Sequence, residues 1–236
     1  MHLHLIRHAD PDYERNSLTL QGHLEAQALA DRFAIDGLDA LYASDTVRAI
    51  ETARYTAARL DLSVQILPWL REPDSLHISQ QGRIYCLWDT FGETIRADSP
   101  PPGQQDWHTR APFDNPEVLK MWQTFRNHCD LLLAQQGYLR ENGRYRIRTS
   151  NRKRLAFFCH NATVLLFLAH LLELPFPLVC CGFYSWPSSV TTIYFEEQSQ
   201  QWAVPRALHV ADVSHLYAAG LRPQPRAMGD RYEAYW

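Results

Sequence analysis

The chain has 236 residues, of which 46% are hydrophobic and 21% are charged, and its formal net charge at pH 7 is −3. These values predict a folded globular protein with enough apolar side chains for one sizeable core. The small negative charge gives no reason to expect a nucleic acid or another polyanion as an obligatory partner. The first residues show no signal-peptide pattern, and the longest apolar run, 164–169, is far too short to span a membrane.

The five cysteines form an odd set without the spacing of metal ligands: Cys86, Cys129, Cys159, Cys180 and Cys181. Such a set is typical of reduced thiols in a cytoplasmic protein. We therefore expect a cytoplasmic protein that requires no metal and no other cofactor. The composition does not decide between a monomer and a homodimer.

Strand, polar loop and helix alternate over the first part of the chain. Strands are expected at 3–6, 40–43 and 64–67, with one helix at 21–33, capped by Thr19, and another that opens at Ser44-Asp45. This alternation predicts an α/β fold, a three-layer α/β/α sandwich in which helices cover both faces of a mostly parallel sheet. We expect one domain over residues 1–236.

Residues 74–115 interrupt that alternation. They contain Trp88, Trp107 and the prolines at 100–102, and a structureless loop of this length is uncommon inside a compact domain unless it has a function. We expect an insertion with a short helix at 84–90 that acts as a lid or a specificity segment. In this interpretation the two tryptophans help to choose the substrate.

The alternation resumes after the insertion. Asn115-Pro116-Glu117 predicts the start of a helix that runs to about 136, and Asn142-Gly143 predicts the turn of an edge hairpin over 138–148. The remaining expected elements are a strand at 155–159, a helix at 163–172, an antiparallel edge pair at 190–195 and 202–208, and an irregular tail beyond 209.

Residues 140–154 are strongly basic, with seven lysines and arginines and one acidic residue, Glu141. One interpretation is a solvated edge hairpin whose charge prevents aggregation. The other is a docking patch for an anionic partner or nucleic acid. We favour the first.

Polar side chains follow three of the expected strands, at Arg7-His8, at 44–48, which includes Arg48, and at His160-Asn161. The carboxyl ends of neighbouring parallel strands meet at one edge of a sheet, where α/β proteins place their sites. Arginine offers a charged planar fork that matches phosphate oxygens two at a time. The sequence therefore predicts a pocket for a phosphoryl dianion.

Such a pocket can support nucleophilic catalysis. A neutral imidazole surrounded by arginines can attack phosphorus and form a phosphohistidine, and the positive surroundings oppose protonation of the ring. A carboxylic acid is then needed to protonate the leaving oxygen and afterwards to activate water. Glu72, just after the third strand, is the candidate for this acid/base, and Asp74 is the substitute.

Four segments together resemble the histidine phosphatase superfamily, the phosphoglycerate-mutase-like fold. They are Leu5-Ile6-Arg7-His8-Ala9-Asp10, Leu18-Thr19-Leu20-Gln21-Gly22, Ser44-Asp45-Thr46-Val47-Arg48-Ala49-Ile50-Glu51-Thr52-Ala53 and Cys159-His160-Asn161-Ala162. Two departures are present: Ala9 stands where the family has glycine, and Asn161-Ala162 replaces a glycine pair.

The resemblance implies a phosphoric monoester hydrolase with His8 as the phosphorylated nucleophile. It implies that Arg7, Arg48 and His160 hold the phosphoryl group, that Asn161 belongs to this phosphate-binding set, and that Glu72 is the acid/base. The substrate is expected to be a small phosphorylated molecule that the sequence does not identify. Two alternatives stay open: a mutase that returns the phosphoryl group to a second hydroxyl, and a phosphate-binding module without catalysis.

Overall fold

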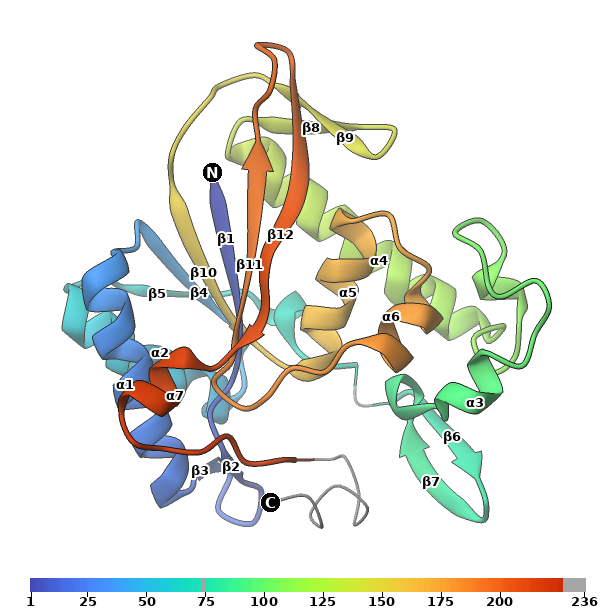
Figure 1. Ribbon diagram of the computed structural model, residues 1–236, viewed down its shortest axis with the longest axis horizontal. Coiled ribbons are helices and arrows are strands. Elements are labelled where there is room, and N and C mark those ends of the chain that lie inside the picture. Colours follow the sequence, from blue (N-terminus) through green and yellow to red (C-terminus); the bar gives the residue numbers. More distant parts are fainter. Residues whose placement is uncertain (74, 227–236) are drawn as a thin grey trace.

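The computed structural model describes residues 1–73 and 75–226, and its centre is an eight-stranded sheet with the order β5-β4-β10-β1-β11-β12-β9-β8 (Figure 1). The strands of this sheet are β1 (His2–Arg7), β4 (Ala40–Ala43), β5 (Val64–Ile66), β8 (Tyr138–Glu141), β9 (Arg144–Ile147), β10 (Arg154–Cys159), β11 (Val190–Glu196) and β12 (Trp202–Asp212). The first strand of the chain therefore lies in the middle of the sheet.

The α/β class is confirmed, but the sheet is mixed rather than mostly parallel. The strands β5, β4, β10 and β1 are parallel to one another, and every pairing from β1 through β11, β12 and β9 to β8 is antiparallel. The pair β11–β12 does not form an edge, because the hairpin β8–β9 adds to it: Trp202 pairs with Arg146 and Ala203 with Tyr145. The hairpin itself, with its turn at Asn142-Gly143, is confirmed.

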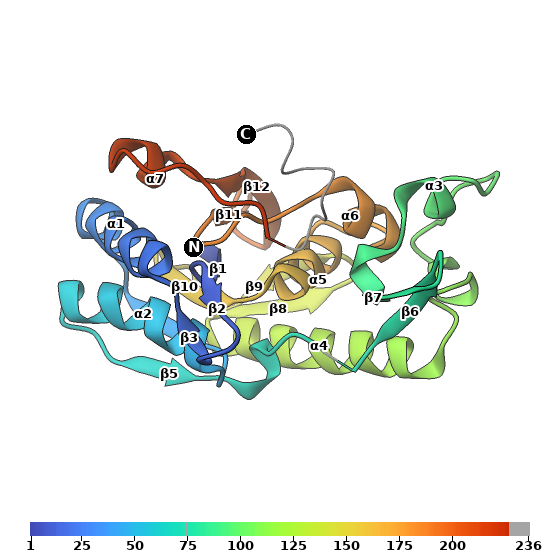
Figure 2. The same ribbon diagram turned by 90° about the horizontal axis from the view of Figure 1, so that it is seen from below.

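Helices cover both faces of the sheet, as the sequence predicts. The helices are α1 (Leu20–Asp36), α2 (Val47–Leu60), α3 (Gly92–Ile95), α4 (Pro116–Gln135), α5 (Asn161–Leu171), α6 (Phe176–Gly182) and α7 (Ser214–Ala218). Leu3 and Leu5 of β1 join a core with α4 and α5, whereas Ile6 joins a second core with α1 and α2. Figure 2 shows α1 and α2 side by side, apart from α4 and α5.

Two of the expected helix caps are confirmed and one is wrong. Thr19 accepts a hydrogen bond from the Gly22 amide at the start of α1, and Asn115 accepts one from the Glu117 amide at the start of α4. The helix expected to open at Ser44-Asp45 begins later, with Thr46 as its N-cap and without a side-chain cap bond. Ser44 contacts His160 instead, so its side chain serves the site rather than the helix.

The insertion is folded, but the helix expected at 84–90 is wrong. A hairpin of β6 (His77–Gln80) and β7 (Arg83–Cys86) is followed by the 3₁₀ turn η2 (Leu87–Asp89), by α3 and by the 3₁₀ turn η3 (Trp107–Thr109). The hairpin turns at Gln81 and Gly82, which both have positive φ. This turn resembles the common Asn-Gly turn, but glutamine in its first position weakens the sequence signal.

Aromatic packing anchors this insertion to the rest of the molecule. Trp107 is 2% exposed, and its ring lies 5.5 Å from Trp122 of α4 and 5.8 Å from Phe176 of α6 in edge-on contacts. Trp88 is also buried in this core. Neither ring is available to a substrate, which corrects the expectation that the two tryptophans select it by contact.

The segment after residue 209 is more regular than expected. Strand β12 continues to Asp212, and α7 follows it and packs against α1. Among the described residues, no helix combines the length and the apolar character needed to cross a membrane. Two short strands, β2 (Pro11–Asp12) and β3 (Ser17–Leu18), pair in the loop after β1, and the 3₁₀ turn η1 (Pro68–Leu70) follows β5.

Candidate active site at the ends of the parallel strands

The predicted site residues meet at the carboxyl ends of the parallel strands. His8 directly follows β1, Arg48 lies in the first turn of α2, and His160 is the N-cap of α5, directly after β10. The rings of His8 and His160 lie 5.1 Å apart, centroid to centroid, and meet edge-on. The ends of β1 and β10 therefore bring the two imidazoles together, and the start of α2 adds Arg48.

His8 is held as a neutral ring whose Nε2 carries the lone pair. Its Nδ1 lies 2.8 Å from the carbonyl oxygen of Ala9, so Nδ1 carries the proton. Its Nε2 accepts a hydrogen bond from Nε of Arg48 at 3.1 Å. Burial lowers the pKa of His8 well below its usual value, and the charges of His160, Arg7 and Arg48 lower it further. Nε2 is therefore the nucleophilic atom.

His160 has the opposite tautomer. Arg48 donates from Nη2 to Nδ1 of His160 at 3.2 Å, so Nδ1 is an acceptor and the proton lies on Nε2. That Nε2 donates to the hydroxyl of Ser44 at 2.9 Å. The pKa of His160 is held well below its usual value by burial first, and then by the charges of Arg48, Arg7 and Arg71. One arginine thus bridges the two rings.

Arg7 is 4% exposed and lies in a fixed position beside these rings. Its Nη1 donates to the carbonyl oxygen of Ser185 at 2.7 Å and to the hydroxyl of Tyr184 at 3.1 Å. Its Nε is buried and has no hydrogen-bond partner among the described residues. A buried donor without an acceptor is costly, so this atom is well suited to an oxyanion that enters the pocket.

Glu72 lies at the amino-terminal end of α5. Its Oε1 accepts a hydrogen bond from the amide of Ala162 at 2.8 Å, which places the carboxylate one residue beyond Asn161. The alternative acid, Asp74, lies outside the described residues. The Ala162 amide, at the start of α5, is therefore occupied by Glu72 in this structure.

The side chain of Asn161 is bonded to the loop that contains Ser185. Its Oδ1 accepts a hydrogen bond from the amide of Ser185 at 3.1 Å. Because the carbonyl of Ser185 accepts from Arg7, Asn161 fixes the loop that orients this arginine. The expected role of Asn161 as a phosphate ligand therefore stays a prediction.

Two charged groups near the site were not foreseen. Asp10, which is 1% exposed, pairs with Arg226, and the backbone of Arg226 is bonded to the hydroxyl of Tyr184. Asp89 of the insertion lies within electrostatic range of Glu72 and Arg7. Asp10 is only two residues beyond His8, but Arg226 and Asp89 are far in sequence from the other site residues, so no spacing could have identified those two.

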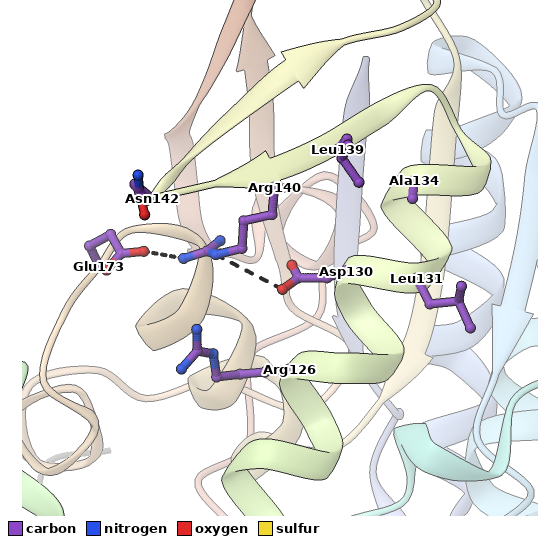
Figure 3. A pocket seen from close by; sticks show the side chains of 9 residues that line it. Arg126, Asp130, Leu131, Ala134, Leu139, Arg140, Asn142 and Glu173 are labelled. Carbon is purple, nitrogen blue, oxygen red and sulfur yellow. Dashed lines mark hydrogen bonds and ion pairs between the residues drawn. The ribbon is translucent and has the colours of Figure 1, made fainter.

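A hollow of about 560 Å³ lies elsewhere, between α4 and the hairpin β8–β9 (Figure 3). Arg140 crosses it and is paired with Glu173 and, at 3.9 Å, with Asp130. Asp130 belongs to a group of three potential metal ligands, with Cys129 and His170. Its Oδ1 lies 2.8 Å from Nε2 of His170 and accepts from the Tyr145 hydroxyl, so hydrogen bonds already satisfy this carboxylate.

Comparisons with known proteins agree with the fold. Structures with similar folds include a mutant phosphoserine phosphatase from Entamoeba histolytica in complex with phosphoserine (TM-score 0.59, 19% identity), the mycobacterial glucosyl-3-phosphoglycerate phosphatase with inorganic phosphate (0.60, 19%), and YhfR from Bacillus stearothermophilus (0.60, 20%). In each case 91% of this chain and 98% of the other are covered. No curated protein sequence matches the chain. Residues 3–204 match the family described as the histidine phosphatase superfamily, branch 1, and the chain belongs to that family.

Proposed function

We propose that the protein hydrolyses phosphomonoesters of small molecules through a phosphohistidine intermediate at His8, without a metal ion. The observation that carries the proposal is the state of His8: a buried, neutral imidazole whose Nδ1–H is fixed on the Ala9 carbonyl and whose Nε2 lone pair faces Arg48. A surrounding of fixed cations is the arrangement needed to receive a dianion beside a nucleophile.

In the first step, the phosphoryl group replaces the contacts that the pocket residues make with each other. Arg48 exchanges its hydrogen bonds to the two histidines for bonds to phosphoryl oxygens, which frees Nε2 of His8. The buried Nε of Arg7 gains an acceptor. Nε2 attacks phosphorus, the N–P bond forms, and the bond from phosphorus to the leaving oxygen breaks.

Glu72 is the proposed proton donor for the leaving oxygen. An alkoxide is a poor leaving group, so a carboxylic acid must supply a proton as the bond breaks. In the second step the resulting carboxylate takes a proton from water, water attacks phosphorus, and the N–P bond of the phosphohistidine breaks. The Ala162 amide that holds Oε1 fixes the carboxyl group beside the phosphate pocket in both steps.

The similar structures support hydrolysis of small phosphorylated molecules. Two of them are named phosphatases, one with phosphoserine bound and one with inorganic phosphate bound. The loop between β1 and α1 is short, with only the two-residue strands β2 and β3, and this favours a hydrolase over a mutase. Cytoplasmic location, a single domain over the full chain and the substrate-selecting role of 74–115 remain predictions.

The test is an assay that measures the release of inorganic phosphate from a panel of phosphorylated metabolites in the presence of EDTA. Free phosphate is expected with the wild-type protein, and the same rate is expected when EDTA is replaced by magnesium. His8→Ala should abolish turnover and leave no acid-labile phosphoryl-enzyme. An isomerised product would indicate a mutase, and binding without turnover would indicate a phosphate-binding module.

Glu72 can be tested separately, with the type of leaving group as the variable. Glu72→Gln should reduce turnover of alkyl phosphates much more than phosphorylation of His8 by an activated aryl phosphate, because a phenolate leaves without a proton. The phosphoryl-enzyme should then accumulate, since the base for water is lost. Wild-type behaviour on both classes would mean that another residue, with Asp74 the first candidate, is the acid.

A further inference from the structure

The C-terminal segment, residues 221–226, returns to the active site from the far end of the sequence. It runs from α7 past the carboxyl end of β1 to the loop that contains β2 and β3 (Figure 1). Pro223 and Pro225 restrict its backbone, and Pro223 is buried. Its last described residue, Arg226, contacts both Asp10 and Tyr184, so this segment joins two loops of the site.

The side chain of Arg226 forms a two-point ion pair with the buried carboxylate of Asp10. Its Nη2 donates to Oδ2 at 2.8 Å, and its Nε donates to Oδ1. Within residues 1–73 and 75–226, no other lysine or arginine is paired with Asp10. A charge pair with one buried partner and two parallel hydrogen bonds fixes geometry well. The C-terminal segment is therefore anchored two residues beyond His8.

The hydroxyl of Tyr184 connects the backbone of Arg226 to Arg7. It donates to the carbonyl oxygen of Arg226 at 2.6 Å and accepts from the Arg226 amide at 3.0 Å. It also accepts from Nη1 of Arg7 at 3.1 Å. Because its only proton is directed to Arg226, the hydroxyl presents a lone pair to Arg7. The position of Arg226 therefore determines how Tyr184 meets this arginine.

The loop that carries Tyr184, residues 183–189, is held at a second point by α7. Nε2 of His215 lies 3.1 Å from the Ser188 hydroxyl, and the Ser188 amide donates to the carbonyl oxygen of His8 at 3.1 Å. Residues 183–189 thus contact both Arg7 and His8, and residues 214–226 hold this loop near each of its ends.

We propose that Arg226 is a positioning residue for the phosphoryl transfer. Its ion pair with Asp10 anchors the C-terminal segment, and the anchored backbone holds the Tyr184 hydroxyl, which fixes Nη1 of Arg7. The buried Nε of Arg7, which has no partner within the described part of the chain, is then already in place for a phosphoryl oxygen. A donor fixed in advance loses less conformational entropy when the anion binds. This inference rests on the proposed phosphatase function.

Inorganic phosphate is the probe for this role, because calorimetry measures its binding without turnover. Arg226→Met keeps an unbranched side chain and removes the guanidinium. It should weaken phosphate binding by about 10-fold, the effect of about one charge-assisted hydrogen bond. The KM for p-nitrophenyl phosphate should rise by a similar factor and kcat should change less, since Arg7 holds the phosphoryl group before and during the reaction. Arg222→Met, which removes an exposed arginine from the same segment, is the control and should bind phosphate like the wild type.

A double variant tests the route through Tyr184. Tyr184→Phe removes the hydroxyl between Arg226 and Arg7 and should weaken phosphate binding by a factor similar to that of Arg226→Met. In the Tyr184→Phe protein, the further change Arg226→Met should have little effect, because both substitutions interrupt the same connection. Independent effects would instead multiply. Arg226→Lys, which keeps the charge but loses the planar fork, should lie between the wild type and Arg226→Met.

Thermal unfolding separates this role from a merely structural one. A structural role would lower the unfolding temperature of Arg226→Met and leave phosphate binding by the folded protein unchanged. If Arg226→Met is unfolded at the assay temperature, Arg226→Lys takes its place in both comparisons. Unchanged phosphate binding, or a full further loss in the Tyr184→Phe protein, would overturn the role of Arg226 and leave the hydrolase intact. Absence of phosphate release from every substrate by the wild type, p-nitrophenyl phosphate included, would overturn the proposed function and this inference with it.

Discussion

Acidification should destabilise the protein through His4, a histidine of β1 that takes no part in the proposed chemistry. His4 is 8% exposed, its Nδ1 contacts the Thr192 hydroxyl at 3.2 Å, and its Nε2 is buried and has no hydrogen-bond partner among residues 1–73 and 75–226. Burial, with smaller effects from neighbouring charges, lowers its pKa from 6.5 to about 4. The unfolded chain therefore binds a proton at a pH where the folded chain does not.

The size of the effect follows from these two pKa values. Stability is unaffected while the ring is neutral in both states, above pH 6.5, and decreases as the pH falls from 6.5 towards 4. At pH 5 the loss from His4 alone is about 2 kcal/mol, and it approaches a limit of about 3.4 kcal/mol at lower pH. His215, whose pKa burial lowers to about 4, adds a loss in the same direction.

Urea unfolding at pH 7 and at pH 5 measures this loss. The decrease in the free energy of unfolding between the two pH values should be about 2 kcal/mol smaller in His4→Gln than in the wild type. His77→Gln, which changes an exposed histidine of β6, is the control and should behave like the wild type. An equal decrease in His4→Gln and in the wild type would show that proton linkage at His4 is not the cause.

Three further predictions concern single side chains. Arg48→Ala should lower kcat/KM by about 100- to 10,000-fold in steady-state assays, because two charge-assisted hydrogen bonds of about 1.5–3 kcal/mol each are lost. Gly22→Ala should lower the unfolding free energy by about 1–3 kcal/mol in urea and also reduce activity, because an added Cβ would lie 2.2 Å from the Asp10 carbonyl oxygen, next to the nucleophile loop. Trp107→Ala should cost about 3–5 kcal/mol of stability by the same measurement, whereas Ile84→Ala, at a 77% exposed position of the same insertion, should have little effect.

The parallel half of the fold and the centre of the site could be predicted because their signals are local. A buried apolar strand followed by Arg7-His8, and another followed by His160, show directly where functional side chains leave the sheet. The strand order could not be obtained in this way. Whether β11 joins β1 antiparallel, and whether β8–β9 extends the sheet beyond β12, depends on packing between segments that are far apart in sequence.

In the insertion, the contacts of single residues could not be predicted from the sequence either. Trp88 and Trp107 look like substrate contacts in a segment that is otherwise irregular, but a large apolar ring gains more from burial in the core than from exposure in a pocket. No sequence pattern marks Asp89 as a residue near the site, since its position near Glu72 and Arg7 depends on how the hairpin β6–β7 packs against the rest of the molecule. The side chain of Asn161 is bonded to Ser185, a contact that its place after His160 did not reveal.

The central place of β1 also determines when the site can form during synthesis. His2 pairs with Arg154 on one side and with Tyr194 on the other, so β1 leaves the ribosome long before both of its partners and must wait for them. Such long-range pairing makes folding slow and leaves an apolar strand uncovered in the growing chain. A chain that ended at residue 189 would contain His8, Arg48, Glu72 and His160, yet without β11 it would leave one side of β1 unpaired and could not assemble them.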